Sequence, residues 1–241
     1  MIVEPLDDEN EWENFVATSP NGTFFHTLKW KKVLEESFPY ESLYLVIRDS
    51  NDKLIGVCPF LITKKLWPFK VLDSLFESDF AGPLVIEEYK KEVAIVLKNY
   101  LEKLCSDRGI TYARIRFSDA ELCEHFKTKT SKVDTVSGTI NLDLEEKPAD
   151  FIWSKVFSKK KNQRWFIRRF ERDGFQNREA EGLEDIDKFY TLYYDNMNYI
   201  GAQPYPFSFF KNIWNSLYPD NFGIILTEKE EKCIGGESFY I

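Results

Sequence analysis

The chain has 241 residues, of which 43% are hydrophobic and 30% are charged, and its formal net charge is −8. This composition is typical of a soluble globular protein, and the length allows one or two domains. The negative charge opposes binding to DNA, RNA or anionic membranes, so a polyanionic partner would need a local basic patch. The N-terminus is acidic, and no window approaches 18 uncharged apolar residues. We therefore expect neither a signal peptide nor a transmembrane segment.

The cysteine and histidine content argues against a metal site. The chain has no C-x-x-C pair and two histidines, His26 and His125. Zinc sites need closely spaced nitrogen and sulfur ligands, so we expect no bound metal. We expect instead a cytoplasmic protein with four reduced thiols, which are Cys58, Cys105, Cys123 and Cys233.

Helix and strand patterns alternate along the first part of the chain. Apolar spacing predicts a short helix ended by the turn 19–22, and a second helix over 28–37 that stops before Pro39. Residues 42–48 and 53–63 predict a hairpin. Its second strand is almost wholly apolar, which indicates burial on both faces.

The alternation continues beyond this hairpin. Residues 75–85 predict a turn and a short strand, and apolar spacings of 3 and 4 predict a helix over 88–107 that Gly109 ends. Two more strands are expected at 111–117 and 137–144. Strands mixed with helices in this way indicate an α/β or α+β fold with a mixed sheet.

A polar stretch at 145–148 separates two halves, so we expect one domain over 1–147 and another over 148–241. The second half predicts a helical region over 149–173, a strand near 175–180, helices near 186–197 and 208–217, and a hairpin of 222–227 with 233–241. Both halves therefore have the order helix, helix, strand, turn, strand. D-K-L-I-G-V-C-P-F in the first hairpin also aligns with E-K-C-I-G-G-E-S-F in the second, which indicates a weak internal duplication.

The second half opens with a basic helix, predicted over 158–173. Residues 159–172 carry seven basic side chains and one acidic one. At 100° per residue, one group of cations falls within an arc of about 80° and an apolar group falls opposite. The cations are Lys161, Arg164, Arg168 and Arg172, and the apolar residues are Phe166, Ile167 and Phe170. We expect the apolar face to dock on the domain and the cationic face to be exposed.

Two interpretations of the cationic face stay open. Arginine forms paired hydrogen bonds to phosphate or carboxylate, so the face could bind an anionic substrate. It could equally be a solvated surface balanced by acidic neighbours such as Glu179 and Glu181. Trp165 lies on the basic side, where we expect it to pack under arginine stems rather than stack on a nucleic-acid base.

Three segments together resemble a known family. They are T-F-F-H-T-L-K-W-K-K-V at 23–33, S-D-F-A-G-P-L-V at 78–85, and T-I-N-L-D-L at 139–144 followed by the basic stretch at 158–174. Their order and spacing are similar to those of the Fem-type peptidoglycan-bridge aminoacyltransferases and FemAB-like proteins of the GNAT superfamily. The similarity extends over nearly the whole chain.

This resemblance implies a tandem GNAT-like fold and an N-acyltransferase. Family members move an amino acid from aminoacyl-tRNA to an amine of a cell-wall precursor, and more distant relatives use other donors. The resemblance thus implies aminoacyl-tRNA or acyl-CoA as the donor and an anionic small molecule or lipid-linked precursor as the acceptor. Amine attack on an ester or thioester is favourable, so the enzyme mainly supplies positioning, a neutral amine and an oxyanion partner.

The resemblance also assigns substrate-binding residues. Lys32 matches a family lysine two positions after the motif tryptophan, here Trp30, that reaches substrate phosphates. Arg164 matches an arginine of the family's basic helix that faces the acceptor, and Lys161 and Arg168 share its face. His26 stands where many relatives have glutamine, and it is included as a hydrogen-bonding residue whose expected role is structural.

Asp79 is the candidate catalytic base. It precedes the Gly-Pro turn, where a carboxylate could accept the amine proton, and the alternative is a hydrogen bond that stabilises the turn. Two departures from the family pattern stand out. Ala81 replaces an arginine of the bridge-forming enzymes, which weakens the case for the same muropeptide acceptor, and Phe170 replaces a small residue.

In the GNAT fold, the strand matching 233–241 is followed by a loop and helix whose backbone N–H groups hold the pyrophosphate of the donor. We expect the second GNAT copy to be incomplete at this point, the chain to hold no cofactor, and this form to be inactive. The alternative function is a non-catalytic ligand-binding module. A third hypothesis, RNA binding by the basic helix, is disfavoured by the net charge except for a tRNA acceptor stem. An unpaired strand edge near Ile241 would favour a homodimer.

Overall fold

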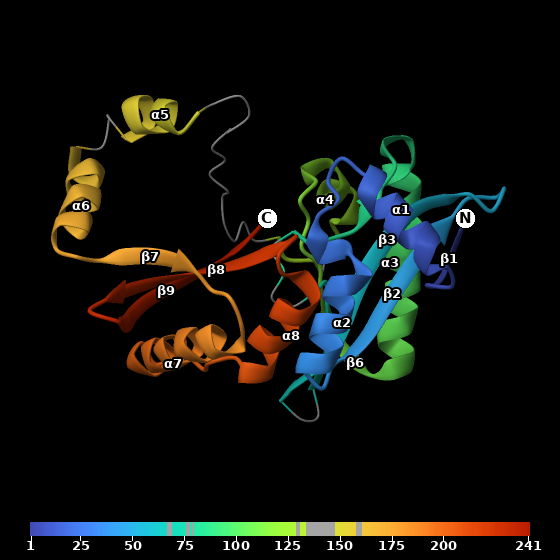
Figure 1. Cartoon of the computed structure of the whole chain (residues 1–241). Coiled ribbons are helices and arrows are strands. Elements are labelled where there is room, and N and C mark those ends of the chain that lie inside the picture. The colour runs from blue at the N-terminus through green and yellow to red at the C-terminus, as the bar shows by residue number, and fades with distance from the viewer. Residues whose placement is uncertain (67–68, 76–77, 79, 129–130, 134–147, 158–160) are drawn as a thin grey trace. The chain divides into compact units, whose positions relative to one another are not determined.

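The computed structural model describes residues 1–66, 69–75, 78, 80–128, 131–133, 148–157 and 161–241 (Figure 1). These residues form two compact units. The first unit is Met1–Lys132 with Asn212–Leu217, and the second is Val133–Lys211 with Tyr218–Ile241. The boundary expected after residue 147 adjoins a segment outside the described residues, and the return of Asn212–Leu217 to the first unit was not predicted.

The first unit is built on a mixed sheet. Its strands are β1 (Ile2–Pro5), β2 (Glu41–Arg48), β3 (Leu54–Leu66), β4 (Phe69–Asp73), β5 (Leu84–Val85) and β6 (Ile110–Arg114). The order is β1-β2-β3-β4-β6. Strand β5 also pairs with β3, at Gly56 and Val57, whereas β4 pairs with β3 from Leu61 onward. Neighbouring strands are antiparallel except β4 and β6, which are parallel. The expected mixed α/β class is confirmed.

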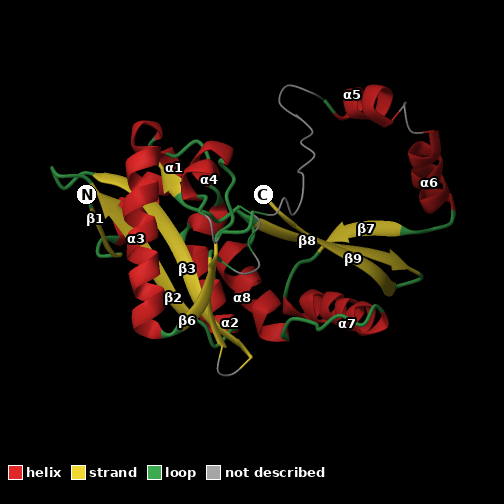
Figure 2. Ribbon diagram, turned by 180° about the vertical axis from the view of Figure 1, so that it is seen from behind, coloured by secondary structure: helices red, strands yellow, loops and turns green. Residues whose placement is uncertain are grey.

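Helices cover both faces of this sheet. They are α1 (Glu9–Thr18), the 3₁₀ turn η1 (Phe24–His26), α2 (Leu28–Ser37), the 3₁₀ turn η2 (Glu87–Tyr89), α3 (Lys90–Arg108) and α4 (Ala120–Phe126). Figures 1 and 2 view the molecule from opposite sides: α2 crosses in front of the sheet in Figure 1, and α3 crosses in front in Figure 2. The two helices therefore lie on opposite faces.

Apolar periodicity explains the core of the first unit. All residues of β3 from Leu54 to Thr63 are buried, as the continuous apolar run predicted. The apolar stripe of α3 buries Val93, Leu97 and Leu101 against the same core cluster. The helix ends at Gly109, whose φ of 61° is left-handed and suits a residue without a Cβ atom.

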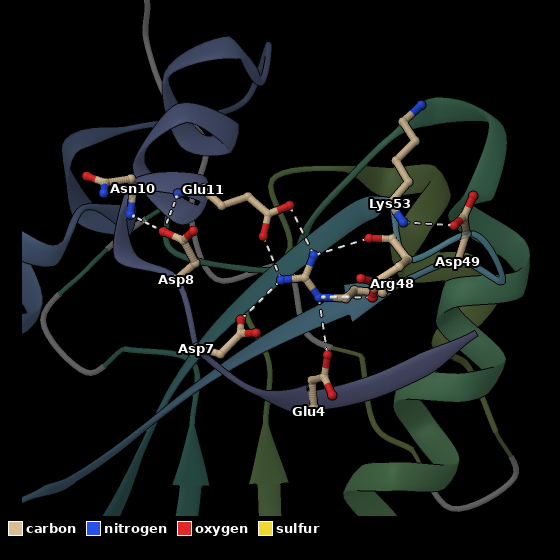
Figure 3. A network of polar contacts seen from close by, with 9 residues as sticks. Glu4, Asp7, Asp8, Asn10, Glu11, Arg48, Asp49 and Lys53 are labelled. Carbon is tan, nitrogen blue, oxygen red and sulfur yellow. Dashed lines mark hydrogen bonds and ion pairs between the residues drawn. The ribbon is translucent and has the colours of Figure 1, made fainter.

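A buried arginine connects the strands and the first helix of this unit (Figure 3). The Arg48 side chain is 9% exposed and forms ion pairs with Glu4, Asp7 and Glu11 at 3.2, 3.1 and 2.6 Å. Asp8 caps α1 by accepting hydrogen bonds from the backbone N–H groups of Asn10 and Glu11. The acidic N-terminal segment is therefore fixed to β2 by Arg48.

The second unit begins with helical segments and continues into a smaller sheet. Its elements are α5 (Ala149–Phe151), the π-helical turn η3 (Ile152–Val156), α6 (Lys161–Arg172), β7 (Gln176–Glu179), α7 (Leu183–Tyr199), α8 (Phe207–Leu217), β8 (Phe222–Lys229) and β9 (Lys232–Tyr240). The strands form an antiparallel sheet in the order β7-β8-β9. Helix α7 contacts β8 and β9, and α8 contributes its last six residues to the first unit.

The two hairpins share a structural detail that agrees with the internal duplication. In the first, the register shifts between Ile47 and Arg48, and Arg48 pairs with Leu54. In the second, the register shifts between Thr227 and Glu228, and Glu228 pairs with Cys233. Leu54 and Cys233 occupy the same position in the sequence alignment of the two hairpins, so the irregularity occurs at equivalent positions.

Most expected elements are present, with a few corrections. The strand expected over 111–117 spans Ile110–Arg114, and the helix expected from residue 88 begins at Lys90 after η2. Elements β1, β4 and α4 were not predicted, because each is short and carries little periodicity. The strand expected at 137–144 lies outside the described residues. In the described part of the chain, every helix is too short or too polar to cross a bilayer.

Candidate functional site

Three segments of the first unit meet at the carboxyl ends of the parallel strands β4 and β6. They are η1 with the start of α2, the residues that follow β4, and the residues that follow β6. Ser74 N donates to Arg114 O at 2.9 Å, and Arg116 N donates to Ser74 Oγ at 2.7 Å. In open α/β sheets, ligands often bind at the carboxyl ends of strands. We call this region the β4–β6 end.

Gly82 closes the β4–β6 end. A Cβ atom at this position would lie 1.8 Å from Arg116 O, so any larger residue would displace the backbone. The same glycine accepts a hydrogen bond through its carbonyl oxygen from His26 Nε2 at 3.0 Å. The turn before β5 is therefore fixed from two sides, by the backbone after β6 and by η1.

His26 is fully buried and uses both ring nitrogens within the chain. Nδ1 accepts from the Thr23 backbone N–H at 3.2 Å, so Nε2 carries the proton that it donates to Gly82 O. Burial lowers the pKa of His26 from 6.5 to about 4, because the charged form loses its hydration, although both hydrogen bonds act in the opposite direction. His26 therefore holds the Gly82 turn in place, and the substrate contact named for it stays a prediction.

Trp30 is also fully buried. Its indole N–H donates to Ser78 Oγ at 2.7 Å. The rings of Phe24 and Phe25 pack edge-on against it, with centroids 5.7 and 5.3 Å away. The Trp30 indole thus holds Ser78 in place, and the substrate contact predicted for Trp30 stays a prediction.

A buried carboxylate with two arginines forms the polar part of the β4–β6 end. Asp73, the last residue of β4, is 0% exposed. Arg114 Nε donates to Asp73 Oδ2 at 2.9 Å, and a second nitrogen of Arg114 donates to the same oxygen. Arg116 Nη1 donates to Asp73 Oδ1 at 2.6 Å. The pairing also raises the pKa of Arg114, so its charge is permanent.

Lys32 lies on the solvent side of α2. Its side chain is 67% exposed, and its ammonium group is 3.8 Å from Glu36 Oε1, one helical turn away. An exposed pair at this distance holds the lysine weakly. Lys32 therefore remains available to an anion. Asp79, the candidate base, lies outside the described residues, although its neighbour Ser78 is buried.

In the second unit, Arg164 does not point freely from the basic helix. It donates to the backbone oxygen of Trp153, and its guanidinium group lies 5.4 Å from the Trp153 ring centroid. Arg168 approaches the same ring at 5.9 Å and stays exposed. Lys161 begins α6, and its side chain lies outside the described residues. The cationic face is thus partly occupied by contacts to η3.

The prediction that α6 docks through its apolar face is only partly confirmed. Phe170 stacks on Phe175 with ring centroids 5.2 Å apart, whereas Phe166 is 59% exposed. Trp165 packs under an arginine as expected, since the Arg169 guanidinium lies 5.1 Å from its ring centroid. The helix therefore docks through its C-terminal turn rather than along its whole apolar face.

Two hollows in the described residues lie apart from these predicted site residues. One, of about 350 Å³, is lined by Pro39, Tyr40, Glu41, Ile62 and Lys70. The other, of about 410 Å³, lies at the N-terminal end of α7 and is lined by Arg178 and residues 181–185. Within the described residues, no cluster of His, Cys, Asp or Glu has the composition of a metal site.

Sequence reasoning missed Asp73, Arg114 and Arg116. The alternation R-I-R in the strand expected over 111–117 predicts both arginines on one face, and this signal was available. Their convergence on Asp73 was not available, because it depends on the pairing of β4 with β6 across 41 and 43 residues.

Comparison with known proteins concerns the fold. No family model and no curated protein sequence matches the chain. Among solved structures, FemX matches with a TM-score of 0.62 and 15% identity, over 95% of this chain and 58% of its own. An aminoglycoside 6'-N-acetyltransferase, AAC(6')-Ih from Acinetobacter baumannii, and a probable acetyltransferase match with TM-scores of 0.36 and 0.39, at 15% identity. They cover 58% and 59% of this chain and 99% and 97% of their own.

The last two scores are too low to support an argument. The FemX match extends across both units of this chain, which spans little more than half the length of FemX. At 15% identity the match establishes architecture and not activity. The chain has a mixed α/β, GNAT-like fold that it shares with FemX over 95% of its length.

Proposed function

We propose that the chain belongs to an N-acyltransferase of the Fem type, which transfers an aminoacyl or acyl group to an amine of an anionic cell-envelope precursor. The observation that carries this proposal is the fold shared with FemX over 95% of the chain. The three sequence motifs described above support it independently, since two of them flank the β4–β6 end.

The chemistry assigned to the enzyme is aminolysis. The acceptor nitrogen attacks the carbonyl carbon of an aminoacyl ester or acyl thioester, a C–N bond forms, and the C–O or C–S bond breaks. The amine proton passes to a base, for which we propose Asp79. Aminoacyl-tRNA, engaged through its acceptor stem, or acyl-CoA is the proposed donor. Holding the acceptor still near this carbonyl supplies most of the rate enhancement.

In the first unit, Lys32 is the proposed contact for an acceptor phosphate. In the second unit, described by itself, Arg168 is the proposed anion contact of the basic helix. Lys32 supports this role because it is exposed and only weakly paired with Glu36. Arg164 is held by Trp153, so we propose that it positions η3 rather than binding the acceptor through a free guanidinium group.

Acceptor binding tests the proposal. The 241-residue chain should bind a nucleotide-linked, phosphate-bearing muramyl peptide in isothermal titration calorimetry, and Lys32→Ala should weaken binding about tenfold, the usual effect of one lost charge-assisted contact. Lys103→Ala, an exposed lysine on α3, is the matched control. Equal affinity in the two variants would remove Lys32 from the site.

Acyl transfer is measured separately, with aminoacyl-tRNA and with acyl-CoA as donors. Amide formation on the bound acceptor would support the transferase. Binding without transfer by either donor would favour the non-catalytic ligand-binding module, and the absence of acceptor binding would contradict both functions.

A further inference from the structure

The β4–β6 end differs in charge balance from three other ion clusters of the described chain, each of which contains one buried charged residue, Arg48, Lys90 or Asp185. Arg48 faces four carboxylates, and Lys90 faces Glu87, Asp119 and Glu121. In a third cluster, two cations, Arg178 and Lys188, are paired with two carboxylates, Asp185 and Glu228. In each cluster the negative charge equals or exceeds the positive charge. Such clusters are complete within the protein.

At the β4–β6 end the balance is reversed. Two guanidinium groups face Asp73 alone, which leaves one excess positive charge among the described residues, in a chain of net charge −8. Arg169 and Arg172 also share one carboxylate, Asp173, but both are exposed on a helix end where water solvates them. Asp73, in contrast, is fully buried, so this excess charge is held in place by the core.

The two guanidinium groups retain unused donors. Each arginine has five N–H groups. Arg114 engages Asp73 through Nε and Nη2, and Arg116 engages Asp73, Ser74 O and Leu75 O through Nη1. Among the described residues, nothing accepts from Arg114 Nη1 or from Arg116 Nε and Nη2. Since the side chains are 40% and 30% exposed, unused donors are accessible from solvent.

These donors are also preorganised. Asp73 and the backbone oxygens of Ser74 and Leu75 hold the guanidinium planes from the protein side, and Ser74 Oγ fixes the backbone of Arg116. A ligand therefore need not order two flexible side chains on binding, which removes a large part of the usual entropic cost. Planar guanidinium forks match the geometry of phosphate and carboxylate oxygens.

We infer that Arg114 and Arg116, anchored on Asp73, form a binding site for an oxyanion, either a phosphoryl or a carboxylate group. The assignment of this oxyanion to the acceptor rests on the proposed function. The site lies in the first unit, at the carboxyl ends of β4 and β6, beside Gly82, whose Cβ position would lie 1.8 Å from Arg116 O. Arg114 is the principal ligand, because Arg116 is tied more closely to the backbone.

Inorganic pyrophosphate and acetate are the probes, added to the full chain at low ionic strength and followed by ¹H–¹⁵N NMR. We expect saturable shifts in the amides of residues 114–117. Tighter binding of pyrophosphate would assign a phosphoryl group, and equal or tighter binding of acetate would assign a carboxylate. The absence of saturable shifts with both probes would overturn the inference.

Substitutions locate the site. Arg114→Gln, which can still hydrogen-bond Asp73, should weaken binding at least about tenfold, the effect of losing one charge-assisted hydrogen bond. Arg114→Lys keeps the charge, so it should weaken anion binding less than Arg114→Gln does. If Arg114→Gln unfolds, Arg114→Lys takes its place in the test. Arg108→Gln is the matched control, since Arg108 is 43% exposed and pairs with Glu41 in the same unit. Equal losses in the Arg108 and Arg114 variants would refute the site.

The outcomes separate this inference from the proposed function. The protein could bind anions through Arg114 and yet bind no muramyl peptide. That result would support the oxyanion site and contradict its assignment to the acceptor. Acceptor binding that depends on Lys32 but is unchanged in Arg114→Gln would keep the proposed function and remove this site from it.

Discussion

His26 shows how burial turns a polar residue into a structural one. Its ring replaces water with hydrogen bonds to Thr23 and Gly82, and burial lowers its pKa to about 4. In the unfolded chain the pKa returns to about 6.5. Between these two values the unfolded state binds a proton that the folded state excludes, so folding stability falls as pH decreases through this window.

We therefore predict that the free energy of unfolding falls between pH 7 and pH 5, with about 2 kcal/mol of the loss due to His26. His26→Gln, which cannot titrate, should be less sensitive to pH by that amount. Urea denaturation of both proteins at the two pH values measures the difference, in which the other titrating groups cancel. Identical pH dependence in the two proteins would show that the pKa of His26 is the same in the folded and unfolded chain.

The buried positions of His26 and Trp30 also bear on the candidate site at the residue scale. Both belong to the motif at 23–33, and both point into the protein, where they hold the Gly82 turn and Ser78. A sequence motif of this kind indicates a site without showing which of its members contact ligand. Burial separates the two groups: Lys32 and Lys29 are exposed, whereas His26 and Trp30 are fully buried.

At the scale of elements, α3 carries the crossover between the parallel strands β4 and β6. Its length is set by an apolar stripe and by Gly109, which ends the helix in a left-handed conformation directly before β6 begins at Ile110. The end of α3 thus fixes where β6 starts, and with it the position of Arg114 opposite Asp73.

Gly109→Ala should lower the free energy of unfolding by about 1 kcal/mol, because a Cβ atom is strained at a φ of 61°. No atom lies within 4 Å of the position that this Cβ would take, so the loss would report backbone strain and not a steric clash. Asn99→Ala, on the exposed side of the same helix, should leave stability unchanged or raise it slightly. Chemical denaturation compares both with the parent chain, and a neutral Gly109→Ala would contradict the strain.

At the scale of the whole molecule, the chain consists of two compact units, and Arg48 belongs to the first. Removing the shared cation leaves the carboxylates of Glu4, Asp7 and Glu11 close together without a counter-charge, although water solvates them because they are 40%, 60% and 36% exposed. Arg48→Met should therefore destabilise the first unit.

Hydrogen exchange resolves this effect by unit. Amides of β2 and β3 should exchange faster in Arg48→Met, whereas amides of β8 in the second unit should keep their rates, as expected for separately cooperative domains. Lys53→Met, in the exposed turn after Arg48, is the control and should change neither. Equal acceleration in β8 would show that the whole chain unfolds as one cooperative body.

The sequence by itself determined the local elements. The apolar run of β3, the period of α3 with its terminal glycine, and both hairpins follow from interactions between residues close in the chain, and these predictions are confirmed. The alternation of helices and strands likewise indicated a mixed α/β fold, which is confirmed. The short elements β1, β4 and α4 carried too few periodic positions to be recognised.

Only the tertiary structure decided what the polar residues do. Asp73 meets Arg114 and Arg116, His26 meets Gly82, and Trp30 meets Ser78 across more than 40 residues in each case. Such contacts depend on strand order and register, which the packing of the whole unit sets and no local pattern specifies. For the same reason, the sequence identified the region around 23–33 and 78–85, and the packing decided which of its side chains face solvent and which are buried.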